Sequence, residues 1–135
     1  MSKVAALLGL ILAGNALAVE VDPKVWVPMA SSESNNEKHD FYGKIGSFTH
    51  TKKFTTGIIQ QVTNDKLSND GKVTYYKIKI SNAECAQGFG KLNYYDLGDN
   101  YLFNADFIKD GGSVGASLGE ILCMVGAGLA KSERS

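Results

Sequence analysis

The chain has 135 residues, of which 44% are hydrophobic, and its 14 lysines and arginines balance 14 aspartates and glutamates. This length is enough for one domain with a modest core. The balanced charge argues against nucleic acid or an anionic membrane as the main partner, because both are bound through surplus lysine and arginine.

The first 18 residues, MSKVAALLGLILAGNALA, have the pattern of a secretory signal peptide. Lys3 is the charged start, residues 4–13 are apolar, and Ala-Leu-Ala resembles a cleavage site between Ala18 and Val19. The apolar run is shorter than the roughly 20 residues of a membrane-spanning helix. A buried amino-terminal helix is the alternative. We expect an exported protein, in the periplasm, at the cell surface or secreted, with no stable membrane insertion after cleavage.

The segments that follow predict strands separated by polar turns. Residues 24–29 are apolar and bounded by prolines, which favours an edge strand. The polar run SSESNNEKHD, residues 31–40, indicates an exposed loop or mobile arm. Residues 40–45 and 55–62 are expected strands, and Asp70-Gly71 is typical of a hairpin turn.

Residues 72–80, KVTYYKIKI, alternate between apolar and polar positions as a half-buried strand does. Tyr76, Ile78 and Ile80 lie on one side. Tyr75, Lys77 and Lys79 lie on the other and form a possible recognition surface for a protein partner. A simply solvated row is the alternative. Cys85 follows in an expected turn.

An aromatic hairpin and a helix complete the predicted α+β domain, which spans residues 19–130. Its strands are residues 89–97 and 101–107, with Tyr101, Phe103, Ala105 and Phe107 expected on one face. Ser113 is a natural cap for the helix that follows. An apolar stripe (Val114, Leu118, Ile121, Leu122, Val125) should face the sheet, beside a row of Gly115, Gly119 and Cys123 that permits close packing. Residues 131–135 are expected to be disordered.

The two cysteines, Cys85 and Cys123, most often pair in an exported protein. Two free buried thiols are the alternative, and a metal site is disfavoured because neither cysteine has a nearby ligand in sequence. The bond would close a loop of about 39 residues and add roughly 4 kcal/mol at most. We expect it to tie the glycine-rich helix to the small antiparallel sheet.

The string G-x-S-x-G occurs around Ser113 and Ser117 and is typical of hydrolase nucleophiles. That fold needs an acid and a histidine after the serine, and no histidine follows His50. The acidic pairs Asp96/Asp99 and Asp106/Asp110 flank turns, where carboxylates are usually solvated. We therefore expect no catalytic residues, no metal, no cofactor and no enzymatic activity.

The order of these features resembles the bacterial surface-adhesin protein E-like domain family. The resemblance covers residues 41–123. It is carried by an aromatic pair and serine (Phe41, Tyr42, Ser47), the strand YYKIKISNAEC, the aromatic hairpin, Gly112-Ser113 and the ending EILC. It implies an antiparallel sheet with a carboxy-terminal helix held by a disulfide, and a binding role toward host matrix or serum proteins. Only Cys85 and Cys123 carry over by motif, and no lipid-accepting cysteine follows the signal peptide.

Two functions remain open at this point. The first is an exported, non-enzymatic protein-binding module of the adhesin type. The second is a periplasmic inhibitor or immunity protein against a toxin or lytic enzyme. Both fit the size, the export signal and the absence of an evident catalytic motif.

Overall fold

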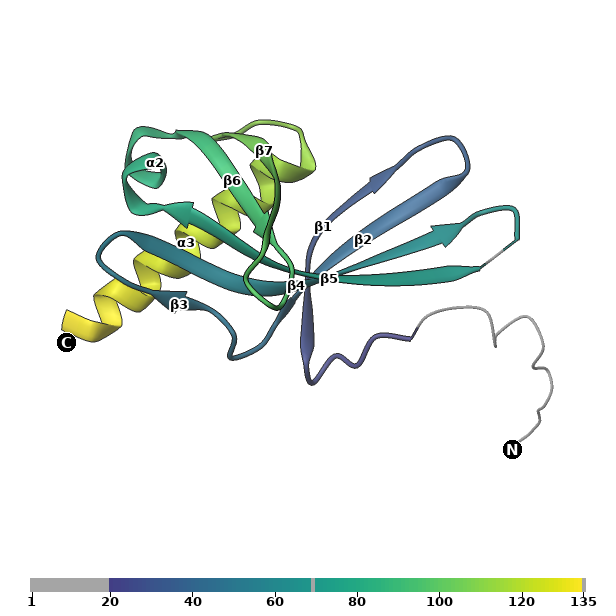
Figure 1. Cartoon of the computed structure of the whole chain (residues 1–135), viewed down its shortest axis with the longest axis horizontal. Coiled ribbons are helices and arrows are strands. Elements are labelled where there is room, and N and C mark those ends of the chain that lie inside the picture. Colours follow the sequence, from purple (N-terminus) through teal and green to yellow (C-terminus); the bar gives the residue numbers. More distant parts are fainter. Residues whose placement is uncertain (1–19, 69, 135) are drawn as a thin grey trace.

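The computed structural model describes residues 20–68 and 70–134. Within them, a seven-stranded antiparallel sheet is covered on one face by a long carboxy-terminal helix, so the expected α+β class is confirmed (Figure 1). The expected signal peptide and the Ala18–Val19 junction lie outside the described residues. The strands are β1 (Trp26–Glu33), β2 (Glu37–Lys44), β3 (Thr49–His50), β4 (Phe54–Asp65), β5 (Gly71–Ser81), β6 (Phe89–Tyr95) and β7 (Tyr101–Ile108), and the helices are α2 (Asn82–Gln87) and α3 (Val114–Arg134).

The sheet is a meander in the order β1-β2-β4-β5-β6-β7, with the short β3 paired to β4. β4 and β5 pair along nearly their whole length, from Phe54 opposite Ser81 to Asn64 opposite Gly71. In Figure 1 the β1–β2 and β4–β5 hairpins extend to the right, beyond the amino-terminal start of α3. The sheet therefore has a part packed against the helix and a projecting part.

The hydrophobic core lies between α3 and the facing side of the sheet. Its fully buried side chains alternate along the strands, as period-2 packing requires. The sheet contributes Ile59, Ile78, Ile80, Leu92 and Phe107, and α3 contributes Leu118 and Leu122. At about 25 cal/mol per Å² of buried apolar surface, such side chains each stabilise the fold by about 1.5–3 kcal/mol.

The glycines of α3 bring its backbone close to β7, as the sequence predicted. A methyl group built on Gly115 would lie 2.8 Å from the carbonyl oxygen of Asp106, and one on Gly119 would lie 2.5 Å from Cδ1 of Phe107. Ser113 caps the helix, since its Oγ accepts a hydrogen bond of 3.0 Å from the amide of Ala116.

The disulfide Cys85–Cys123 is present and joins α2 to α3, with 5.5 Å between the two Cα atoms. Cys85 lies in a short helix and not in the expected turn. Ser81 and Glu84 form a capping box that starts this helix. The S-x-x-E pattern at residues 81–84 is a sequence signal that could have predicted this helix, and the expectation of a turn missed it.

The polar segment 31–40 is a β-hairpin, so the expected loop or mobile arm is wrong. Ser31–Glu33 ends β1 and Glu37–Asp40 begins β2, with β4 pairing on the other side of β2. Glu33 lies opposite Lys38 and forms an ion pair of 3.1 Å with Lys66. The segment forms strands because β2 pairs with both β1 and β4, and its polar composition alone does not predict this pairing. β1 is an edge strand as expected, with a register shift next to Pro28.

Two expectations for the carboxy-terminal half also need correction. A register shift between Tyr94 and Tyr95 places Tyr101 opposite Tyr95, 5.8 Å between ring centroids, on the outer face away from Phe103. Phe103 instead stacks on Tyr94. The tail expected to be disordered is helical through Arg134, because α3 continues past its last buried residue.

By length and composition alone, the stretch Val114–Ser132 is apolar enough to cross a membrane, with a mean hydropathy of 1.4. Core helices share these properties. Here one third of that stretch is buried within the protein, including Leu118 and Leu122. The apolar character of α3 is therefore used, at least in part, for packing on the sheet.

Candidate binding surface

The outer side of β5 carries the three residues that the sequence singled out, and the structure divides them. Lys77 and Lys79 line a hollow of about 430 Å³. Tyr75 lies outside it, with its ring 5.9 Å from that of Trp26. The hollow, not the whole row, is the candidate binding surface.

Residues from six segments meet in this hollow. They come from the connection before β3, from β3, β4, β5 and β6, and from the β6–β7 turn. The lining residues are Ser47, Thr49, Thr56, Gly57, Ile58, Lys77, Lys79, Tyr95 and Asp99. These residues are far apart in the sequence. They come together because Thr56 pairs with Lys79 and because the β6–β7 turn folds over β5.

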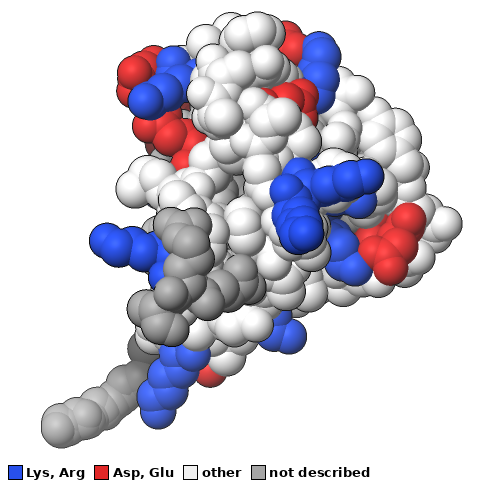
Figure 2. All heavy atoms as spheres, turned by 90° about the vertical axis from the view of Figure 1, so that its left-hand side faces the viewer, with Lys and Arg blue, Asp and Glu red and all other residues white. Residues whose placement is uncertain are grey.

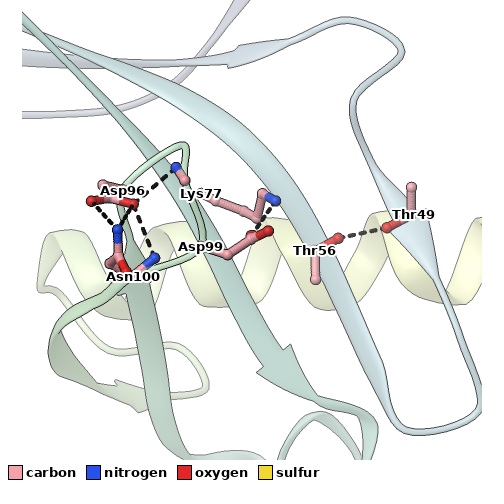
Figure 3. A network of polar contacts seen from close by, with 7 residues as sticks. Thr49, Thr56, Lys77, Asp96, Asp99 and Asn100 are labelled. Atoms are coloured by element: carbon pink, nitrogen blue, oxygen red, sulfur yellow. Dashed lines mark hydrogen bonds and ion pairs between the residues drawn. The ribbon is translucent and has the colours of Figure 1, made fainter.

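The β6–β7 turn holds a carboxylate against Lys77 (Figure 3). Asp96 fixes the turn by accepting hydrogen bonds of 2.9 Å from the amides of both Gly98 and Asn100. These bonds, those from Asn100 first, hold the pKa of Asp96 below its usual value. Asp99 has a left-handed backbone with φ of 70° and pairs with the ammonium of Lys77.

Lys79 has different surroundings. Its ammonium lies 4.6 Å from the ring centroid of Phe54 and 5.2 Å from that of Tyr95. Within residues 20–68 and 70–134, no carboxylate lies within ion-pair distance of it. Aromatic rings attract a cation through their negative faces, so Lys79 is held in place while its charge stays open to a ligand.

Hydroxyl groups line the hollow on the side away from the β6–β7 turn (Figure 3). Thr49 and Thr56 share a hydrogen bond of 2.5 Å (Figure 3). Ser47 Oγ donates to the carbonyl of Lys44 at 2.7 Å and accepts from the amide of Ile58 at 3.0 Å. Ser47 therefore shapes this side of the hollow, while the threonines present polar groups to it.

The side chains considered for serine chemistry lie elsewhere and have structural partners. Ser113 caps α3. The two histidines each bond to a threonine of β4 at 2.9 Å, His39 to Thr63 and His50 to Thr55. Among the described residues no hydrogen bond joins either histidine to Ser113. The hollow itself is lined by two lysines, hydroxyl groups, the ring of Tyr95 and the carboxylate of Asp99, all of which can contact a ligand.

Charges on the neighbouring surface are mixed. Lys91 pairs with Asp106 on the outer face of β6 and β7. Figure 2 shows blue and red side chains interspersed, with one group of basic side chains near the middle of the view. The side of the molecule seen in Figure 2 is therefore not a continuous basic surface.

Comparison of the chain with protein-family models, with curated proteins and with solved structures gives no match. The interpretation of the hollow rests on its own geometry and chemistry.

Proposed function

We propose that the protein is an exported, non-enzymatic module that binds a protein partner through the hollow around Lys77 and Lys79. The observation that carries this proposal is the open cation of Lys79, held over Phe54 and Tyr95 beside a second lysine. Interfaces favour such combinations of aromatic surface with a few oriented polar groups.

Export is supported by two independent features. The leader has the pattern of a signal peptide, and the protein carries the disulfide Cys85–Cys123. Disulfides persist in oxidising compartments and are rare where thiols are kept reduced.

The partner class is proposed from the resemblance to the surface-adhesin protein E-like domains. An antiparallel sheet with a disulfide-held carboxy-terminal helix is the architecture that this resemblance implies. We propose a host matrix or serum protein as the partner. The alternative partner is a lytic enzyme or toxin bound by a periplasmic inhibitor.

The proposal is tested by binding of the purified, oxidised protein to immobilised matrix and serum proteins and, in parallel, to bacterial lytic enzymes. The double variant Lys77→Glu/Lys79→Glu should weaken the interaction about tenfold or more, because charge reversal replaces attraction by repulsion. Lys91→Glu, on the same outer face, is the matched control and should bind like the wild type.

Each outcome separates the candidates. Tight one-to-one binding to an enzyme would favour the inhibitor, and binding to matrix proteins the adhesin. Binding that is unchanged in the double variant would rule out the hollow as the site. Antibody labelling of intact and permeabilised cells then tells surface display from retention in the periplasm.

A further inference from the structure

We propose that the hollow receives an acidic side chain of the partner, placed against Lys79 and Lys77, and that Asp99 is a built-in competitor for the same cations. This inference rests on the proposed function and specifies its ligand chemistry. It follows from the unequal surroundings of the two lysines.

The two lysines are placed to share one carboxylate. They are two residues apart on one side of β5, so their Cα atoms lie about 6.5–7 Å from each other. Both side chains line the hollow. A carboxylate accepts several charge-assisted hydrogen bonds of about 2.8 Å, so it can contact both ammonium groups at once.

Asp99 of the same chain already forms an ion pair with one of these two lysines, Lys77. The turn that presents it is fixed by the bonds to Asp96, and its own backbone is held in the left-handed region, which non-glycine residues seldom adopt. The Asp99 side chain is nevertheless 69% exposed. Exposed ion pairs contribute little stability, so a ligand carboxylate can displace Asp99 at small cost.

The remaining lining favours a carboxylate on a protein over a sulfated or phosphorylated polymer. Two lysines and one aspartate give the hollow a formal charge of only +1. Ile58 and Tyr95 offer apolar contact for the methylene groups of a glutamate. A polyanion is bound by a continuous basic surface, whereas Lys77 and the nearby Lys91 are each paired with a carboxylate.

The test is a nuclear magnetic resonance titration of the purified, oxidised protein with a capped hexaglutamate peptide. A capped hexaglutamine peptide is the matched control. Amide signals of residues 77–79 and 95–99 should move with hexaglutamate and not with hexaglutamine. Asp99→Asn keeps the turn, because asparagine tolerates the left-handed backbone, and should tighten binding about two- to fivefold. Lys79→Gln should weaken it by a similar factor, and Lys91→Gln should leave it unchanged.

Three results would overturn the inference. They are the absence of signal changes at the hollow in both wild type and Asp99→Asn, weaker binding by Asp99→Asn, and tighter binding of a sulfated oligosaccharide than of hexaglutamate. If partner binding still depends on Lys77 and Lys79 in such a case, the proposed function stands and only the acidic ligand and the role of Asp99 fall.

Discussion

The two sides of β5 show how differently neighbouring residues of one strand are used. On the side facing α3, Ile78 and Ile80 are fully buried. On the outer side, Lys77 and Lys79 line a solvent-open hollow, and Tyr75 is 44% exposed. The residues on the inner side must be apolar because they pack against the helix. The outer side contributes little to stability and is free to take part in recognition.

The same division holds along α3. Gly119 is buried against Phe107, whereas Gly128, two and a half turns later, is exposed and has open space where a side chain would begin. A glycine on the inner side of the helix therefore permits close packing, whereas a glycine on the outer side has no packing role.

The strongest test of the comparison is to truncate adjacent residues of β5. Ile78→Ala should lower the free energy of unfolding by about 2–5 kcal/mol, because it leaves a cavity in a close-packed core. Lys79→Ala should cost about 1 kcal/mol or less, the size of a solvent-exposed contact with aromatic rings. Urea unfolding of both variants measures the difference. Equal losses would mean that the outer side is also part of the stabilising core.

The second test uses the two glycines of α3. Gly119→Ala should destabilise the protein by up to about 2 kcal/mol, since crowding against Phe107 costs about 1–3 kcal/mol and the helix-propensity gain offsets only about 1 kcal/mol of it. Gly128→Ala should stabilise it by about 0.5–1 kcal/mol, because only the propensity gain remains. Thermal unfolding measures both shifts. Shifts of the same sign would contradict the close approach of α3 to β7.

The sequence predicted those elements in which a local pattern and the packing agree. Alternation marked β5, paired aromatic segments marked the β6–β7 hairpin, and the glycine row anticipated the approach of α3 and its disulfide. The hairpin at residues 31–40 could not be predicted, because its polar residues become strands only through pairing with β4.

The hollow could be predicted only in part. Lys77 and Lys79 were identified from the alternation of β5. Phe54, Tyr95 and Asp99 were not grouped with them, because register and turn geometry bring these residues to the lysines. A bulge likewise moved Tyr101 to the outer face. One-residue register changes are invisible in composition and reverse the side on which a residue lies.

Glu84, unlike Lys77 and Lys79, is a charged group whose hydrogen bonds belong to the fold and not to the candidate binding surface. Its partial burial alone would raise its pKa, but hydrogen bonds from the amide of Lys91, at 2.7 Å, and from Ser81 outweigh burial and hold the pKa below its usual value. A carboxylate with a lowered pKa in the folded state stabilises the protein above its unfolded pKa of about 4.5. That contribution is lost as the pH falls through the lower folded value.

Glu84→Gln should therefore reduce the free energy of unfolding at pH 7 by about 1 kcal/mol or less, because glutamine can still complete the capping box but loses the charge that strengthens these hydrogen bonds. Below about pH 4.5 its stability should converge on that of the wild type, which loses the same contribution by protonation. Urea unfolding at pH 7 and pH 3 measures both differences. A difference between variant and wild type that stays constant over this range would mean that the loss of stability does not depend on the charge of Glu84.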